Sequence, residues 1–301
     1  MRLSFHTLDV FTQTRFGGNP LAVVHGADAL DADRMQAIAR EFNLSETVFV
    51  LTPSNPMHSA RVRIFTPAAE LPFAGHPTVG TAALLAELRG DKFSGSHDAI
   101  VVLEEAIGIV RVGVRLRDGE ASFAEFDAPR LPEEVGSLAP DEDLAAAVGL
   151  LPSEIGLENH KPTCYSLGLP FTFIPVRSLE AMQRSRAVLG LWDKAIDKQG
   201  GAYLYCRETS RQAAHFHARM FAPGHGIMED PATGSAAAAF AAVVQRFDDL
   251  PAGEHRYLIE QGLEMGRPSD IHLALVVEGS RLQTVRIGGH SVRVAHGEIE
   301  V

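Results

Sequence analysis

Short runs of alternating or continuous apolar residues recur along the chain and predict strands. Between the strand-like runs, "DADRMQAIAREFN" places Met35, Ile38, Ala39 and Phe42 at helical spacing, with an aspartate available as the cap, and predicts a helix over 31–43. The predicted strands of the first half are "FHTLDVFT" (5–12), "PLAVV" (20–24), "ETVFVL" (46–51) and "ARVRIFT" (60–66), followed by a hairpin over 106–126.

Two kinds of turn signal join these elements. The glycine-rich "RFGGN" separates the first two strands, and the pair Asp118-Gly119 is expected to supply the positive φ angles of the tight hairpin turn. In the second half we predict a helix over 179–192 and a closing meander over 271–301 that turns at 278–279 and at 288–289. The further predicted strands of this half are 171–176, 202–206 and 213–221.

The strands arrive as hairpins and meanders, which favours mostly antiparallel sheets over a doubly wound parallel sheet. The segment "DAPRLPEEVGSLAPDED" is rich in proline and acidic residues and has little periodicity, so we place a domain boundary there. We therefore expect an α/β protein with domains 1–128 and 129–301, in which the last strand can pack on the first domain.

A repeated phrase supports two related halves. "GHPTVGTAALL" begins at Gly75 and "EDPATGSAAAAF" begins at Glu229; each follows a similar strand end, "RIFTP" (63–67) or "RMFAP" (219–223). Each half thus reads as a strand, a loop, Pro-x-x-Gly-(Thr/Ser)-Ala-Ala and a helix, as expected of a duplicated unit. The alanines predict slim helices that a sheet can wrap closely, so we expect both helices to be central and buried.

The residue before each proline is titratable. Proline suits the first turn of a helix, so we expect His76 and Asp230 to lie at two helix N-termini, whose unpaired N–H groups attract a carboxylate. If the halves are related by an approximate twofold axis, both termini meet at one cleft. Asp230 has a second interpretation as a simple N-cap, and Ser235 as a space filler. His76 is a poor cap, and a histidine at a positive helix end tends to be neutral.

Other residues also carry two interpretations. Glu46 begins a strand on the face shared by Val48 and Val50, so it is either a general base beside apolar walls or a solvated carboxylate at a strand edge. "HFH" puts His215 and His217 on one strand face, which either holds a metal with a third ligand such as His225 or is simply polar; no carboxylate stands at metal-ligand spacing, which favours the polar face.

Composition narrows the function classes. The 301 residues are 46% hydrophobic and carry a formal charge of −11, without a basic cluster, so nucleic acid is not an expected partner. No apolar run approaches membrane-spanning length, and the N-terminal stretch "MRLSFHTLDVF" has no apolar h-region of the kind found in a signal peptide. Two cysteines without CxxC spacing predict neither disulfides nor a thiolate zinc site and fit a reducing cytoplasm. Neither a GxGxxG nor a GxxxxGK(S/T) loop is present.

At this point the motifs resemble a known family. "LDVFT" with "GGNPLAVV", "NLSETVFV", "RIFTPAAELPFAGHPTVGTA" and "FAPGHGIMEDPATGSAAAAFAA" together are similar to the PhzF family of phenazine-biosynthesis-like isomerases, in order and through essentially the whole chain. The resemblance implies a diaminopimelate-epimerase-like fold, with two pseudo-symmetric domains that each wrap a mostly antiparallel, barrel-like sheet around a central helix. It also implies a site in the cleft between them and a homodimer.

The resemblance further implies a reaction without any cofactor or metal. In the phenazine enzyme of the family the substrate is trans-2,3-dihydro-3-hydroxyanthranilate, in which a proton is taken from C3 and returned at C1. By this likeness Glu46 shuttles the proton, while His76, Asp230 and Ser235 surround the substrate. Gly75 and Gly234 let backbone N–H groups approach its carboxylate.

Three alternatives stay open at this stage. The related racemases and epimerases use a cysteine at each helix N-terminus, but Ala74 and Pro231 stand near those places and Cys164 and Cys206 lie outside both repeats, which disfavours a two-thiol mechanism. The chain could instead be an epimerase of another small carboxylic acid. It could also be a non-catalytic binding or interaction protein on the same fold.

Overall fold

The computed structural model describes residues 1–90, 95–196 and 200–301. The chain divides into two compact units, the first made of Met1–Pro129 with Ile287–Val301 and the second of Arg130–Arg286. The secondary structure of unit 1 is β1 (Arg2–Val10), β2 (Asn19–His25), η1 (Ala27–Ala29), α1 (Ala32–Phe42), β3 (Glu46–Leu51), β4 (Ala60–Phe65), β5 (Glu70–Leu71), α2 (Gly75–Gly90), β6 (His97–Glu105), β7 (Gly108–Leu116), β8 (Ser122–Asp127) and most of β17 (Arg281–Glu300).

Unit 2 holds the remaining elements and the first residues of β17. They are β9 (Glu133–Glu134), α3 (Asp141–Ala147), η2 (Pro152–Glu154), β10 (Thr163–Ser166), β11 (Pro170–Pro175), α4 (Leu179–Arg184), α5 (Leu189–Ala195), β12 (Gly201–Cys206), β13 (Phe216–Ala222), η3 (Pro223–His225), β14 (Ile227–Asp230), α6 (Gly234–Phe247), β15 (Gly253–Gln261) and β16 (Ser269–Glu278).

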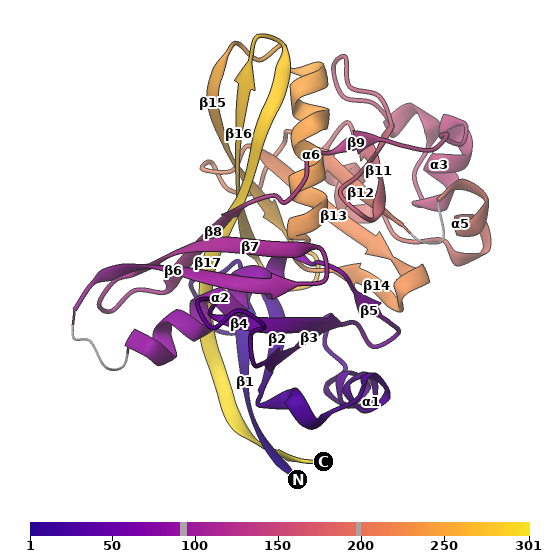
Figure 1. Ribbon diagram of the computed structural model, residues 1–301. Helices are drawn as coiled ribbons and strands as arrows, with labels where there is room; N and C mark the ends of the chain where they lie inside the picture. Colours follow the sequence, from indigo (N-terminus) through magenta and orange to yellow (C-terminus); the bar gives the residue numbers. More distant parts are fainter. Residues whose placement is uncertain (91–94, 197–199) are drawn as a thin grey trace. The chain divides into compact units, whose positions relative to one another are not determined.

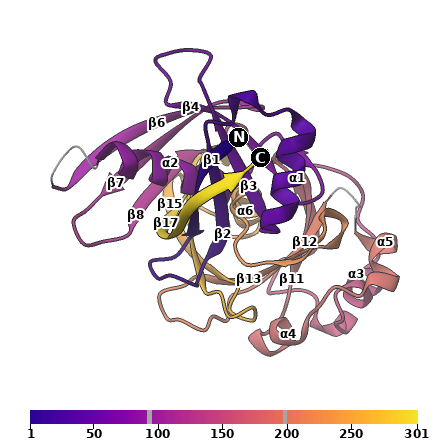
Figure 2. The ribbon, with the colours of Figure 1, turned by 90° about the horizontal axis from the view of Figure 1, so that it is seen from below.

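Unit 1 is a closed barrel around one helix. Its strands pair in the order β1, β2, β3, β4, β6, β7, β8 and β17, and β17 pairs with β1 to close the ring. Most of these pairs are antiparallel; β2–β3 and β4–β6 are parallel. In Figure 1 β1 and β17 run side by side to the two chain ends, which follows from their register, Arg2 opposite Glu300. The amphipathic helix α1 covers β3 from outside, as Figure 2 shows.

The central helix α2 packs against β1, β2, β3, β6, β7 and β8. Its small residues make this enclosure possible: a Cβ on Gly80 would lie 2.6 Å from Val10 Cγ2 and 2.7 Å from Leu21 Cδ2. A side chain at position 80 would therefore push α2 away from β1 and β2. The predicted central, buried helix of the first half is confirmed by the burial of every residue from Gly75 to Leu84.

Unit 2 repeats the principle with α6. This helix packs on β10, β11 and β16, and all of its alanines are buried. Phe240 stands at the centre of an aromatic cluster with Phe173, Tyr205 and Phe216, at ring distances of 5.9, 4.6 and 4.9 Å. Burying such rings supplies a large part of a domain's hydrophobic stabilisation. The strands are again mostly antiparallel, with β11–β12 and β13–β15 parallel.

Some predicted elements are wrong in detail. The helix expected over 179–192 is two helices, α4 and α5, because Nη1 of Arg219 donates hydrogen bonds to the carbonyls of Met182 and Ser185, both at 2.8 Å. These carbonyls close α4 and the chain becomes extended at Ser185. The strands β6, β10, β14 and β15 and the two-residue strands β5 and β9 are not among the elements predicted from sequence.

The two glycine signals of the hairpin and the meander also behave differently from the prediction. Gly119 alone has a positive φ, of 78°, so the turn after β7 is not the expected pair of positive φ angles at Asp118 and Gly119. The strand β17 continues without a turn through Gly288. A Cβ there would lie 2.7 Å from the Cβ of Glu125, so Gly288 lets β17 approach β8 closely. The turn at Gly279, with φ 61°, is confirmed.

Candidate active site

Three polar side chains gather where β2, β3 and α2 begin. Glu46 is the first residue of β3, and the parallel pairing of the two strands sets it opposite Leu21, two residues after Asn19 at the start of β2. His76 is the second residue of α2. The three are buried, with residue exposures of 9% for Glu46, 3% for His76 and 0% for Asn19. Burial contradicts the interpretation of Glu46 as a solvated strand-edge carboxylate.

The ring of His76 lies between the other two side chains. Its Nδ1 is 3.2 Å from Nδ2 of Asn19, and its Nε2 is 3.3 Å from Oε2 of Glu46. An amide NH2 can only donate, so Nδ1 is the acceptor and the proton of a neutral ring is on Nε2, on the side of Glu46. The Nε2–H and Oε2 are in contact without hydrogen-bond alignment, and Nε2 is buried with no hydrogen-bond partner among the described residues.

Burial also fixes the charge of this histidine. It lowers the pKa of His76 from 6.5 to about 3, because the imidazolium ion would lose its hydration. The contact with Glu46 is therefore between a carboxyl group and a neutral ring, not an ion pair, at any pH near neutrality. The expectation that His76 is neutral is consistent with this, and the cause is desolvation.

Asn19 is absent from the candidates chosen by sequence. It stands in the quoted run "GGNPLAVV", directly before a proline, where an asparagine reads as an ordinary turn residue. Only the parallel register of β2 and β3 brings it beside Glu46, and a register of that kind is not visible in a local pattern. Its hydrogen bond to Nδ1 makes it the residue that selects the tautomer of His76.

In unit 2, Asp230 belongs to a second polar array. Its Oδ2 accepts a 2.5 Å hydrogen bond from the hydroxyl of Thr233, and its backbone carbonyl accepts a 2.7 Å bond from Nε2 of Gln261. Gln261 ends β15, and Gly262 follows with φ 77°. A Cβ on Gly262 would lie 2.6 Å from the carbonyl oxygen of Pro231, so glycine is required where this turn meets the loop after Asp230.

The second motif does not place Asp230 in the first turn of its helix. Asp230 ends β14, Pro231 and Ala232 are not helical, and α6 begins only at Gly234 with Thr233 as its cap residue. The simple N-cap interpretation of Asp230 is therefore wrong, because Thr233 holds the N-cap position of α6 and Asp230 belongs to β14. Gly234 and Ser235 are the first two residues of α6, and Ser235 is partly exposed.

The histidines of "HFH" do not share one face. His215 is exposed and its Nδ1 accepts the N–H of Leu258 at 3.0 Å, whereas His217 is fully buried. His217 bridges two carboxylates, with Nδ1 2.8 Å from Glu260 and Nε2 2.9 Å from Glu264. Burial alone would lower its pKa, but these two hydrogen bonds and charges raise it to about 9, so the ring is an imidazolium ion.

A metal interpretation gains no support from this cluster. Both nitrogens of His217 carry protons in the ion, and no group of three or more His, Cys, Asp or Glu side chains with metal-binding geometry is found among residues 1–90, 95–196 and 200–301. The cluster instead supports the second array, since Glu260 is the neighbour of Gln261 in β15. Over the same described ranges, no helix has both the length and the apolarity of a membrane span.

Both cysteines lie outside the two arrays. Cys164 is in β10 and Cys206 ends β12, and both are buried thiols of unit 2. Burial, with the charge of Glu208, raises the pKa of Cys206 to about 12, so it is not a thiolate at neutral pH. Because thiol racemases act through thiolates, these positions do not provide that chemistry.

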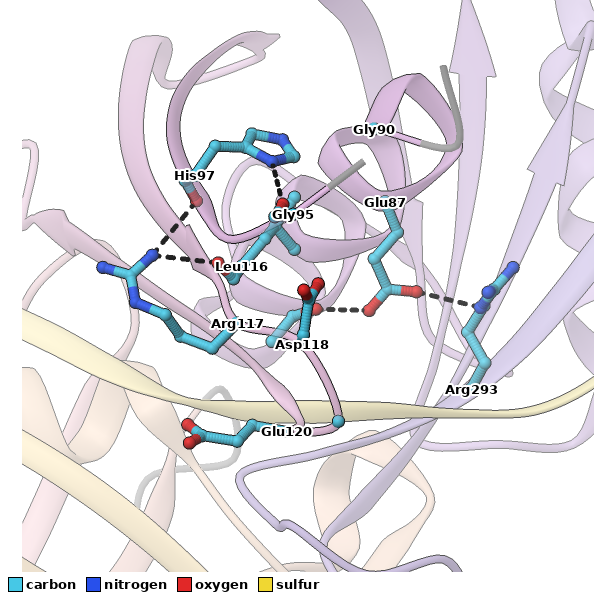
Figure 3. Close-up of a pocket in the computed structure, with 11 residues that line it drawn as sticks. Glu87, Gly90, Gly95, His97, Leu116, Arg117, Asp118, Glu120 and Arg293 are labelled. Carbon is cyan, nitrogen blue, oxygen red and sulfur yellow. Dashed lines mark hydrogen bonds and ion pairs between the residues drawn. The ribbon is translucent and has the colours of Figure 1, made fainter. Parts of the chain in front are cut away.

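Unit 1 also has an open polar recess of about 650 Å³ at one end of the barrel, drawn in Figure 3. Glu87 of α2 connects residues of its lining: it accepts a 2.5 Å hydrogen bond from Ser122 and forms an ion pair with Arg293 at 2.9 Å. His97, Arg117 and these three residues are among its lining. None of the site residues predicted from sequence lines it.

Comparisons with known proteins identify relatives along nearly the whole chain. The model of the phenazine biosynthesis-like (PhzC-PhzF) protein family matches residues 8–297. An uncharacterized isomerase of Mesorhizobium japonicum is 53% identical over 97% of this chain and 96% of its own. The trans-2,3-dihydro-3-hydroxyanthranilate isomerase of Pseudomonas aeruginosa is 36% identical over 96% of each chain. A crystal structure of a Bacillus anthracis phenazine biosynthesis protein of the PhzF family superposes with a TM-score of 0.87 at 26% identity, covering all of both chains.

Proposed function

Because the chain belongs to the phenazine biosynthesis-like PhzF family and is an isomerase, we propose that it moves a proton between two carbons of a small cyclic amino or hydroxy acid, without a metal or organic cofactor. Trans-2,3-dihydro-3-hydroxyanthranilate is the first compound to test, since a relative is named for it. The predicted family and fold class are confirmed by the family match and by the structural neighbour.

One observation carries the proposal. The buried Nε2–H of His76 lacks a hydrogen-bond partner among the described residues and faces the carboxyl group of Glu46 at 3.3 Å. Buried polar groups are nearly always paired, and a catalytic role is one explanation for a group that is not. A donor and a possible base that face each other in a buried setting suit a substrate that has an acceptor group beside an acidic C–H bond.

In this mechanism Glu46 takes the proton from one carbon and returns it to another. His76 donates Nε2–H to a polar group of the substrate and so withdraws electron density while the carbanion-like charge develops. A neutral neighbour suits the base, because a cation at this distance would lower the pKa of Glu46 and weaken it. The low pKa of His76, which keeps its ring neutral, therefore suits the proposed chemistry.

Substrate binding is proposed for the remaining candidates. The N–H groups at Gly75 in α2 and at Gly234 and Ser235 in α6 stand at helix N-termini, which attract carboxylates. Asp230, held by Thr233 and Gln261, is proposed to accept a hydrogen bond from the substrate's amino or hydroxyl group.

The function is tested by proton NMR in heavy water with a panel of unsaturated cyclic amino acids that includes dihydro-hydroxyanthranilate. We expect consumption of a panel member and deuterium at the reprotonated carbon, because a carboxyl group can exchange its proton with solvent between the two steps. Deuterium exchange at an α-carbon with no shift of a double bond would instead identify an epimerase. No turnover with any compound, together with tight binding of one, would identify a binding protein.

Asn19→Asp is expected to lower kcat by at least ~10-fold. An aspartate has the same size but can only accept a hydrogen bond, so the ring proton of His76 moves to Nδ1 and the lone pair of Nε2 then faces Glu46. In a catalytic triad, a reversed histidine tautomer lowers kcat by up to ~10⁴-fold. Nitrogen-15 NMR of the His76 ring gives the tautomer directly. Unchanged kcat in a variant whose tautomer has reversed would contradict the proposed role of Nε2–H.

We also propose a homodimer, on the strength of the family resemblance. Light scattering is expected to give twice the chain mass of 32.5 kDa. A mass of one chain at every concentration from micromolar upwards would refute it.

A further inference from the structure

A buried carboxyl group lies one hydrogen bond from the helix that carries His76. Glu105 is the last residue of β6 and is 8% exposed. Its Oε1 is 2.7 Å from the hydroxyl oxygen of Thr78 in α2, and this hydroxyl is also 2.8 Å from the carbonyl oxygen of Ala74. Ala74 directly precedes Gly75 and His76. The side chain therefore reaches the start of α2 through a single residue.

Counting protons assigns the charge of Glu105. The carbonyl of Ala74 can only accept, and the hydroxyl of Thr78 has one hydrogen, which it donates there. The second contact of this hydroxyl then requires a donor, which is the O–H of Glu105. In this state Oε2 is a carbonyl oxygen, and it has no hydrogen-bond partner among the described residues. A neutral carbonyl tolerates such a place far better than an ionised carboxylate does.

The surroundings of Glu105 agree with this assignment. Burial raises the pKa of its carboxyl to about 8, and the Thr78 hydroxyl opposes this only in part. Among the described residues Glu105 forms no ion pair, and its side chain has Thr78 as its hydrogen-bond partner. The neighbour Glu104 behaves in the opposite way: it accepts the N–H groups of Asn55 and Ser54, which hold its pKa down at about 2.

The turn between β6 and β7, which follows Glu105, also holds the loop before α2 at a second point. The N–H of Ile107, between β6 and β7, donates a 3.1 Å hydrogen bond to the carbonyl of Pro72. With the Glu105–Thr78–Ala74 chain, the β6–β7 turn therefore fixes Pro72 and Ala74, which bracket the approach to His76.

We propose that Glu105 is a positioning residue that works as a neutral carboxylic acid: it donates to Thr78, Thr78 donates to Ala74, and this chain fixes the first turn of α2 so that His76 meets Glu46. The catalytic consequence rests on the function proposed above. The protonation state does not, and it is tested separately.

The test compares Glu105→Gln with Glu105→Ala. The amide of Gln donates to the Thr78 hydroxyl as the acid does, so the Gln variant is expected to restore the kcat that the Ala variant loses. For Glu105→Ala and for Thr78→Val we expect kcat to fall by ~10–100-fold, because small misplacements of catalytic groups cost this much. A role of Glu105 as an ionised base would give the reverse, with Gln as inactive as Ala.

Unfolding measured from pH 5 to pH 9 tests the protonation state without any substrate. The raised pKa means that the contribution of Glu105 to stability is complete below pH 4.5 and is lost as the pH rises to about 8. Gln does not ionise, so the folding constant of Glu105→Gln relative to wild type should rise by up to ~10-fold per pH unit across this window. Glu104→Gln is the matched control and is expected to be less stable than wild type by a constant factor from pH 6 to pH 9.

The stability experiment and the activity experiment can fail independently of each other. If Glu105→Gln runs parallel to wild type over the whole pH range, Glu105 is ionised in the folded protein and the inference is wrong. If the pH dependence appears as expected but no compound is turned over, the neutral acid stands and the proposed function falls.

Discussion

Glu46→Gln is expected to abolish the transfer of a proton between carbons, with a loss of at least ~10²-fold in kcat. The amide keeps the size of the side chain and its place at the start of β3, but it cannot take a proton from carbon. The loss should exceed that of a typical general base, because one group is proposed to act in both half-reactions. Proton NMR in heavy water measures it as slower substrate consumption and slower deuterium incorporation.

The matched control is Glu41→Gln, which makes the same chemical change at an exposed residue of α1 and should leave the rate unchanged. Asp230→Asn is expected to be milder than Glu46→Gln, since Asp230 is proposed to orient the substrate; its melting temperature must be measured too, because the Thr233 hydrogen bond is weakened. Equal rates for wild type and Glu46→Gln would show that Glu46 is not the base.

The second large effect is on stability. His217→Leu should lower the free energy of unfolding by ~3 kcal/mol, because it removes the imidazolium ion that pairs with both buried carboxylates and leaves Glu260 with Arg211 at 3.1 Å and Glu264 with Arg219 at 3.9 Å. Chemical denaturation at pH 6 measures the difference. His215→Ala is the control two residues away, and it should cost under ~1 kcal/mol, since this exposed ring makes a single hydrogen bond to Leu258.

The pH dependence of stability distinguishes a charged His217 from a neutral histidine that is only packed in the core. Because the pKa of His217 is raised from 6.5 to about 9, its stabilisation is complete below pH 6.5 and is lost as the pH rises through 9. The gap between wild type and His217→Leu should therefore narrow from pH 6.5 to pH 10. A gap that stays constant would mean that the folded protein holds a neutral ring.

The candidates Glu46 and His76 could be chosen from sequence because local motifs mark the elements that carry them. The repeated proline phrase marks both buried helices, and "NLSETVFV" marks the strand that begins with Glu46. The residues that were missed act through pairings between distant segments. Asn19 reaches His76 across 57 positions, and Gln261 reaches Asp230 across 31, so no local pattern contains either partner.

The errors in the fold have the same cause. A break in the helix expected over 179–192 depends on Arg219 of a later strand, whose guanidinium takes the carbonyls that would otherwise continue the helix. The sequence predicts a turn at Gly288 because glycine often marks turns. In the structure its missing side chain instead lets β17 lie close to Glu125. In each case the local sequence is compatible with two structures, and a contact with a distant segment determines which one forms.

The closure of the unit 1 barrel by β17 sets the order in which the two units can be completed during synthesis. Strand β1 begins the chain, but one of its two partners is β17, whose pairing residues start at Ser291. All of unit 2 up to Arg286 is made before that strand exists. Domains usually finish in the order in which they are translated. Here the second unit has all its residues first, and the first must wait with an open edge between β1 and β8, where pairing with another unfinished chain competes with its own last strand.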